Sequence, residues 1–403
     1  MQVIVSFLES FKSTFGVYWD FLLLLFGALI PGVVKVATTK FKRLLVRIRL
    51  KNLSDIEDLN VIRICSGTPN YDYNDIHTKV ADKKLFIGFP KELRNKVLEH
   101  DEKFELHDDF SFDGSNTFED ITQKTEIGNF KELIDKHRMI VANEFVARTN
   151  GCLFNRPKFG VYKINYELRK GNDEVPEIRI DFFETDYFTH RVFRSIYHEL
   201  KSQNHPVSQV NQENIKEYLN KYNSFTTSMG VNAFVITESK LGESIIFSKR
   251  SSNAAYSENK FKYNSTVMEG ISQTDLDTYE KRVSLQLAVE RALTEELGLS
   301  KDHQSKHDTK IEFCDFFLEK NYFEIGLTSI VRMDAVFEES ISDLPGKDKE
   351  LEISKLHPVK KSKATIEKFI KDVDIYPQGL FTLKMVCARD MIFINIKKKY
   401  INK

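Results

Sequence analysis

A long apolar run stands near the start of the chain. Residues 13–34 carry a single charge, Asp20, and nearly every position from Phe21 to Ile30 is apolar. A helix over these positions would be about 33 Å long at ~1.5 Å per residue, which matches the hydrocarbon core of a bilayer. The pattern therefore predicts a transmembrane segment over 13–34.

The residues around this run separate the transmembrane interpretation from two others. A secretory signal peptide carries its basic residues before the apolar stretch, whereas here seven basic residues follow it, between positions 35 and 51. A buried core helix would end near position 30, because the Pro-Gly pair at 31–32 breaks the helical pattern. This break and Asp20 leave a re-entrant segment open, and the amphipathic residues 1–12 leave a hairpin open. The basic cluster places the C-terminal remainder in the cytoplasm.

Later parts of the chain carry strand patterns. Residues 159–168 and 178–183 are rich in β-branched and aromatic residues and are separated by a turn sequence. A second pair of strands is predicted at 231–237 and 244–248, and the later strand runs into Lys249-Arg250. A Lys-Arg pair at a strand end can bind phosphates, although a solvated strand end is the more common explanation.

Helical spacing begins at Asp186, which is a suitable N-cap. Apolar residues then recur at positions 192, 193, 196, 197 and 200, so one side of this helix is expected to face a core. The other side carries His190, Arg191 and Arg194 close to the helix start, where unpaired N–H groups favour anions.

A second helix is predicted over 283–299, with Gly298 as its stop. Its apolar stripe consists of Leu285, Val289, Ala292 and Leu293. Glu296 falls about 20° from the centre of that stripe, and Glu295 falls at its edge. A carboxylate on a buried face is costly unless it is paired or bound to a metal. These two glutamates therefore mark a candidate site.

Composition and charge narrow the class of protein. The 403 residues include 59 Lys plus Arg and 59 Asp plus Glu, and 41% are apolar, which excludes wholesale disorder, collagen-like repeats and a polytopic membrane protein. Residues 1–51 hold eight basic and two acidic residues, a net charge of +6, so the remaining 352 residues carry −6. The neutral total argues against DNA or RNA as a partner. An anionic ligand would need a local basic pocket. The four cysteines form no CxxC pair.

The segment from Arg291 to Leu299 resembles the second half of the Nudix box, R-E-U-x-E-E-x-G-U with U aliphatic. In that family the glutamates of the box helix hold divalent metals, which bridge a nucleoside diphosphate linkage for hydrolysis by activated water. The resemblance implies that Glu295 and Glu296 are metal positions and that Mg²⁺ is a possible, but not a required, ion.

The same segment departs from the family at positions whose residues are needed for hydrolysis. Ala292 stands at a position where the family has a metal-binding glutamate, and a methyl group can neither bind a metal nor take a proton. Asp277 and Val283 stand where the first half of the box has a glycine and a glutamate. We therefore assign no catalytic residue and expect that the protein is not an enzyme.

Several features together resemble a narrower family. The apolar N-terminal segment, the run Asp186-Tyr187-Phe188-Thr189, the pair Glu269-Gly270 and the degenerate box resemble the SMODS-associated NUDIX effectors of bacterial anti-phage (CBASS) systems. This resemblance implies an α+β fold, with an N-terminal transmembrane helix followed by a cytosolic Nudix-like α/β/α sandwich that carries an N-terminal extension. It also implies a single-pass protein of the inner membrane whose C-terminal domain is cytoplasmic.

The domain organisation follows from these assignments. We expect an amphipathic segment at 1–12, the transmembrane segment at 13–34 and a basic juxtamembrane linker at 35–55. A family-specific extension would occupy 56–225, and the Nudix-like nucleotide-sensing domain would occupy 226–403.

The resemblance implies an antiviral sensor. A cyclic oligonucleotide made by a CD-NTase would bind the Nudix-like domain, the chains would form a homo-oligomer, and the lipid bilayer of the inner membrane would be disrupted. The candidate phosphate contacts are Arg191, Arg194, Lys249 and Arg250, and the candidates for base stacking are Tyr187 and Phe188. The alternative for each is structural, since aromatic residues often pack inside and arginines often lie on the surface.

Two other functions stay open at this point. A membrane-tethered Nudix hydrolase would act on nucleoside diphosphate derivatives with Mg²⁺ held by Glu295 and Glu296. A membrane scaffold would have no nucleotide site.

Overall fold

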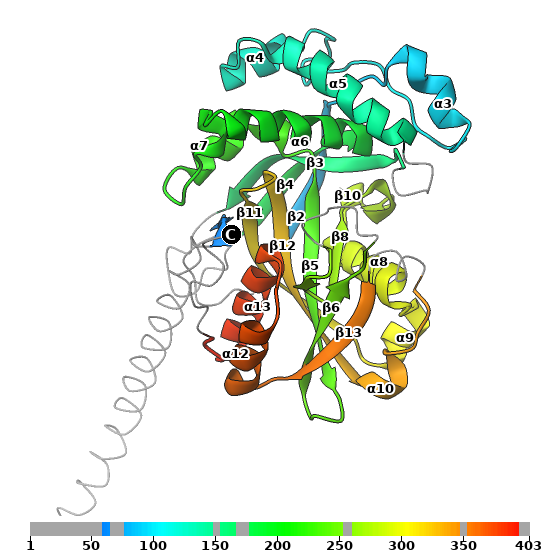
Figure 1. Cartoon of the computed structure of the whole chain (residues 1–403), viewed down its shortest axis with the longest axis vertical. Coiled ribbons are helices and arrows are strands. Elements are labelled where there is room, and N and C mark those ends of the chain that lie inside the picture. Colours follow the sequence, from blue (N-terminus) through cyan, green and yellow to red (C-terminus); the bar gives the residue numbers. More distant parts are fainter. Residues whose placement is uncertain are drawn as a thin grey trace, which may run out of the picture. The chain divides into compact units, whose positions relative to one another are not determined.

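The computed structural model describes residues 59–64, 76–147, 154–166, 177–252, 260–346 and 353–394. The chain divides into two compact units, 1–51 and 52–403, and every described residue belongs to the second. Figure 1 shows this second unit as two sheets with helices packed on them.

The larger sheet has eight strands, and six of them lie in the order β1-β11-β12-β5-β6-β13. The bounds along that order are Val61–Arg63, Lys310–Glu319, Glu324–Val336, Met229–Glu238, Ser244–Arg250 and Ile353–Lys360. The short strands β7 (Tyr263–Asn264) and β8 (Val267–Gly270) pair with β6 and β5. Only the β12–β5 pair of this sheet is parallel among the described pairings. These two central strands are buried on both faces, which explains their nearly continuous apolar sequence.

A smaller sheet has the order β2-β4-β3, with bounds Ile76–Lys84, Ile178–Asp186 and Pro157–Tyr166. Strand β2 runs parallel to β4, and β3 runs antiparallel to it. The strands predicted at 159–168, 178–183, 231–237 and 244–248 are confirmed as β3, β4, β5 and β6, with shifts of a few residues at their ends. A short hairpin, in which β9 (Leu276–Asp277) pairs with β10 (Arg282–Val283), precedes α8 (Leu285–Leu297).

The helices cover both sheets (Figure 1). On the larger sheet, α8 (Leu285–Leu297) and α9 (Lys301–Lys306) lie on one side, and α12 (Lys363–Asp372) and α13 (Pro377–Arg389) lie on the other. The smaller sheet is covered by the N-terminal helices and by α6. Their bounds are α3 Arg94–Leu98, α4 Glu119–Thr125, α5 Phe130–Ala147, α6 Tyr187–Ser202 and α7 Ile215–Lys221, while α10 spans Phe337–Ser340. One continuous apolar core runs through both sheets.

Local signals explain the two helices that matter most for function. Asp186 is confirmed as the N-cap of α6, because its carboxylate accepts a hydrogen bond from the Thr189 N–H at 2.7 Å. Ser284 caps α8 in the same way, and Gly298 ends α8 with a left-handed φ of 79°. The helix predicted over 283–299 is therefore confirmed.

The predicted fold class requires a correction. The expected transmembrane segment at 13–34 lies outside the described residues, and within those residues no helix is both long enough and apolar enough to cross a membrane. Even α5, with 18 residues, carries six charged side chains, and charges are costly in a bilayer. The N-terminal transmembrane helix and the single-pass inner-membrane location are therefore not supported, and the class is corrected to a mixed α/β fold.

Candidate functional site

A cavity of about 200 Å³ lies where α6, the start of β3 and the adjoining ends of β5 and β12 meet. We call it the α6 cavity. Three cationic side chains, three tyrosines, one histidine and two carboxylates line it. They are Lys158, Arg194, Arg250, Tyr187, Tyr322, Tyr376, His190, Glu269 and Glu324. Cationic and aromatic groups together are the combination that binds phosphates and bases.

Lys158, the second residue of β3, reaches into the α6 cavity. Its Nζ donates to Ser228 Oγ at 3.2 Å and stands 5.4 Å from the centre of the Tyr187 ring. Gly270 makes room for it, because a Cβ at that position would lie 3.0 Å from Lys158 Nζ. The glycine therefore leaves the ammonium group at the cavity wall.

Arg194 is held flat against an aromatic ring. Its Cζ lies 3.5 Å from the centre of the Tyr322 ring, and its Nη1 lies 3.5 Å from Glu324 Oε1. Stacking on the ring face and the nearby carboxylate fix the guanidinium in one plane. A planar, preorganised guanidinium is suited to bind a phosphate through two N–H groups.

His190 is uncharged at neutral pH. Its Nε2 lies 3.2 Å from Glu324 Oε1, and its Nδ1 lies 3.1 Å from Thr227 Oγ1. A carboxylate only accepts hydrogen bonds, so Nε2 carries the proton and Nδ1 accepts from the Thr227 hydroxyl. Burial lowers the pKa of His190 to about 4. Burial opposes ionisation of Glu324 as well, but Arg194 and the His190 hydrogen bond outweigh it and lower the pKa of Glu324 to about 2.

Arg250, which lines the cavity, forms a buried pair with Glu296. Arg250 Nη1 lies 3.5 Å from Glu296 Oε2, and both side chains are at most 2% exposed. Glu296 Oε1 also accepts the Met268 N–H at 2.9 Å. A partnered carboxylate of this kind accounts for an acidic residue on the buried face of α8 without a metal ion.

Arg291 supplies a positive charge beside these groups. Its Nε and Nη2 each lie 2.9 Å from an oxygen of Asp275, and Nη2 also donates to the Gly270 carbonyl at 2.7 Å. Its Nη1 lies 3.0 Å from Glu295 Oε2 and 3.3 Å from Glu269 Oε1. Burial alone would lower the pKa of Arg291, but the Asp275, Glu269 and Glu295 carboxylates outweigh it and raise that pKa. One permanent cation thus neutralises part of this acidic cluster.

The same residues are a poor match to a divalent metal site. Glu295 faces Arg291, Glu296 faces Arg250 and a backbone N–H, and Ala292, the third position, is a fully buried methyl group. In the part of the chain that the structure describes, no group of three or more His, Cys, Asp or Glu side chains could hold a metal ion. Metal binding at Glu295 and Glu296 stays a prediction that this arrangement does not favour, and we derive no chemical step through a metal.

The six predicted ligand contacts divide evenly. Tyr187, Arg194 and Arg250 line the α6 cavity. The other three lie elsewhere. Phe188 is 1% exposed and packs on Phe89, Arg191 Nη2 pairs with Glu144 at 2.8 Å, and Lys249 Nζ lies 5.8 Å from the centre of the Tyr263 ring.

Sequence patterns did not identify half of the cavity. Lys158 lies on β3, Tyr322 lies in the β11–β12 turn and Glu324 begins β12, while Tyr376 precedes α13. These segments lie far apart along the chain, and nothing in the local sequence of each indicates that they meet. The helical face of α6 was the available signal, since it already grouped His190 with Arg194.

Comparison with known proteins gives little beyond this geometry. No protein-family model matches the chain, and no curated protein matches its sequence. Similar solved structures include the NUDIX domain of Shewanella oneidensis NrtR complexed with ADP ribose, at 11% identity over 40% of this chain and 86% of that one, with a TM-score of 0.28. They also include RenU, a Nudix hydrolase from M. smegmatis, at 12% identity over 42% and 88%, with a TM-score of 0.25. Both are Nudix domains, but TM-scores this low carry no argument about this chain.

Proposed function

We propose that this protein is a receptor for a cyclic oligonucleotide second messenger, which binds in the α6 cavity. The observation that carries the proposal is the convergence of three cationic side chains and three tyrosines on one cavity from distant segments of the chain. Phosphodiesters need fixed donors, and bases need aromatic faces, so this lining matches both halves of a nucleotide.

The geometry of the α6 cavity suits one part of the messenger rather than the whole molecule. Arg194 presents its edge N–H groups while its face rests on Tyr322, and Lys158 Nζ stands beside the Tyr187 ring. A volume of about 200 Å³ is below the ~300–1,000 Å³ of pockets that enclose a complete small ligand. One base or one phosphate of the messenger therefore enters the cavity, and the rest of the ring lies at its mouth.

Binding is proposed to occur without turnover and without a metal. Arg291 already provides a fixed positive charge among Asp275, Glu269 and Glu295, and the buried Ala292 offers no base. A receptor that leaves its ligand intact keeps the population of the bound state, whereas cleavage would remove it.

The cellular role follows as a further part of the proposal. The messenger would come from a CD-NTase during phage infection, and the bound state would favour a homo-oligomer, as in a CBASS sensor. If ligand binding increases the affinity of the chains for one another, the average molecular mass in solution rises. Light scattering with and without ligand measures this mass. The membrane-disrupting step that the family resemblance implied is not part of this proposal.

A thermal-shift screen of the full-length chain against cyclic di- and trinucleotides tests the receptor function, in buffer with Mg²⁺ and in buffer with EDTA. A ligand that binds only the folded state raises the melting temperature. We expect a shift with at least one cyclic oligonucleotide and the same shift in EDTA. No shift with any member of the panel at saturating concentration would leave the scaffold as the better description.

Two arginines of α6 provide a matched pair of variants. Arg194→Gln removes a cavity donor and is expected to weaken binding about 10- to 100-fold, as a lost charge-assisted hydrogen bond does. Arg191→Gln removes an arginine from the same helix outside the cavity and should leave affinity unchanged. Equal effects of the two substitutions would contradict the placement of the ligand.

A turnover assay separates the receptor from the hydrolase. The chain is incubated with Mg²⁺ and a panel of nucleoside diphosphate derivatives, beside the Glu295→Gln and Glu296→Gln variants. We expect no product above that of the buffer. Robust hydrolysis that Glu295→Gln abolishes, in a variant that keeps its melting temperature, would establish the hydrolase instead.

A further inference from the structure

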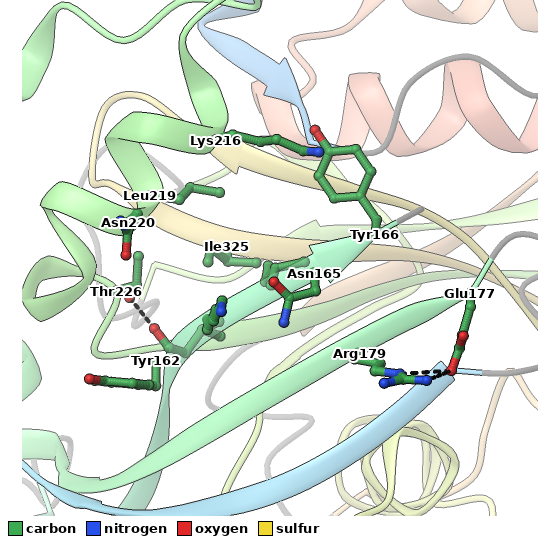
Figure 2. Close-up of a pocket in the computed structure, with 13 residues that line it drawn as sticks. Tyr162, Asn165, Tyr166, Glu177, Arg179, Lys216, Leu219, Asn220, Thr226 and Ile325 are labelled. Atoms are coloured by element: carbon green, nitrogen blue, oxygen red, sulfur yellow. Dashed lines mark hydrogen bonds and ion pairs between the residues drawn. The ribbon is translucent and has the colours of Figure 1, made fainter. Parts of the chain in front are cut away.

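A second and larger hollow lies on the smaller sheet, away from α8. It has a volume of about 830 Å³ and is bounded by β3, by the start of β4 and by α7 (Figure 2). Six consecutive residues of β3, from Val161 to Tyr166, line it. Successive residues of a strand point to opposite faces, so a hollow that touches all six follows the edge of the strand. We call it the β3 groove.

Among the described residues, hydrogen bonding leaves the later half of this edge of β3 open. The Leu85 N–H, just after β2, donates to Glu184 O, so the N–H and C=O groups of Glu184 point toward β2. The residues next to it in β4 therefore direct their N–H and C=O groups toward β3. By the register of β3 against β4, in which Ile164 is opposite Ile180, the N–H and C=O of Ile164 point away from β4. The register assigns the same direction to Val161, whose N–H does donate outward to Thr226 O at 2.8 Å.

The outward bonds stop partway along the strand. Thr226 O and the Asn223 side-chain amide, which donates to Tyr162 O at 3.0 Å, satisfy the first half of the edge. For Ile164 no outward hydrogen bond to any described residue is present. An unpaired donor and acceptor on an edge strand form a template for another strand.

The walls of the β3 groove suit side chains of an added strand. Helix α7 lies opposite the edge and contributes Leu219, and Ile325 of β12 forms part of the floor, so apolar surface lies below the strand edge. A groove between a strand edge and a helix binds extended peptides through main-chain hydrogen bonds, with alternate side chains in pockets.

Charge selects the kind of peptide. Lys163, Arg179, Lys216 and Glu177 line the groove, a net charge of +2 within a unit that is acidic overall. Arg179 is already paired with Glu177 at 2.7 Å, while Lys216 Nζ rests 4.3 Å from the centre of the Tyr166 ring (Figure 2). Lys163 on β3 and Lys216 on α7 are the other two cations that line the groove.

We propose that the β3 groove binds an extended acidic peptide segment of a partner protein, which adds to the smaller sheet as a strand beside β3. Its main chain pairs with Ile164, its acidic side chains meet Lys163 and Lys216, and an apolar side chain enters beside Leu219 and Ile325. This groove adjoins the α6 cavity at Ile325, which lines both hollows, but the proposal does not depend on nucleotide binding.

The probe is a fluorescent peptide of alternating glutamate and valine, and its anisotropy is measured with the full-length chain. A peptide with lysine in place of glutamate is the charge control. Two N-methylated versions of the acidic peptide, shifted by one residue, test strand addition, because only one of them blocks the N–H groups that face β3. We expect the acidic peptide to bind, the basic peptide to bind at least tenfold more weakly, and one N-methylated version to lose roughly tenfold.

Variants of the chain locate the site. Lys163→Glu and Lys216→Glu should each weaken binding about two- to fivefold, as partly exposed ion pairs do, while Lys301→Glu on the distant α9 leaves it unchanged. Ile164→Pro removes the outward donor and leaves the bonds to β4, and Ile164→Val is its control. A melting curve of each variant verifies folding. The proposal is overturned if both charge versions bind alike, if both N-methylated versions retain full affinity, or if Lys301→Glu acts as strongly as the groove variants.

A last outcome concerns the occupant. If the chain itself dimerises and the peptide anisotropy falls as the chain concentration is raised through the range of dimerisation, the groove holds a second copy rather than an acidic partner, and the proposal fails in that form. We expect displacement by the unlabelled acidic peptide alone.

Discussion

We expect the charge of Arg291 to contribute measurably to the free energy of unfolding. Its guanidinium contacts three carboxylates, and the most buried of them, Asp275, is 1% exposed and bonded through both oxygens. Removing the cation from a buried pair leaves an uncompensated charge, which costs about 3–5 kcal/mol. Substitution by methionine keeps most of the side-chain volume, so the loss measures charge and hydrogen bonding rather than packing.

The expected shift follows from the size of the unit. At about 2.1 cal/mol/K per residue, the 352 residues from 52 to 403 give an unfolding entropy of roughly 0.7 kcal/mol/K, so 3–5 kcal/mol corresponds to about 4–7 °C. The Arg291→Met variant should lose this much in a thermal melt of the full-length chain. Arg282→Met is the matched control, since it removes an arginine whose partner, Glu280, is about half exposed, and should cost about 1 °C or less.

A double variant tests the cause. If the buried charge of Asp275 is responsible, Arg291→Met combined with Asp275→Asn should melt above Arg291→Met alone, because the two groups are coupled. A loss from Arg291→Met no larger than that from Arg282→Met would refute the idea that this arginine is an internal cation.

Three more outcomes are expected. Phe188→Ala should lower the free energy of unfolding, measured in urea, by about 3–5 kcal/mol because Phe188 is in the core. Tyr187→Ala should mainly weaken nucleotide binding, by about 1–3 kcal/mol in titration calorimetry. The opposite pattern would exchange the roles of the two residues. Between pH 6.5 and 4, His190 is protonated in the unfolded chain but stays neutral in the folded chain, because burial lowers its pKa to about 4. The free energy of unfolding of the native chain, relative to that of His190→Gln, should therefore fall by up to about 3 kcal/mol as the pH drops through this range. A constant difference between the two chains would show that the imidazole is exposed. Glu319, whose pKa burial raises to about 7, acts in the opposite direction, but it is present in both chains and cancels. Gly270→Ala should displace the Lys158 ammonium and weaken nucleotide binding with little change in melting temperature, and an unchanged affinity would remove Lys158 from the site.

Local features of the fold were predictable from the amino-acid sequence. The cap at Asp186, the stop at Gly298 and the strands that became β3 to β6 each depend on residues a few positions apart. Short-range hydrogen bonds and side-chain periodicity determine such features, and both are visible along the chain. The apolar run at 13–34 was visible in the same way, yet the transmembrane helix inferred from it is not supported.

The sequence by itself determined that Glu296 sits on the buried face of a helix and that Arg194 shares a helix face with His190. Only the tertiary structure decided what these groups face: Glu296 meets Arg250 and the Met268 N–H, and Arg194 meets Tyr322 across 128 residues of chain. Helical spacing gives the direction of a side chain but not its partner. Partners come from the packing of distant segments, whose arrangement depends on burial of the whole core rather than on any short stretch of sequence.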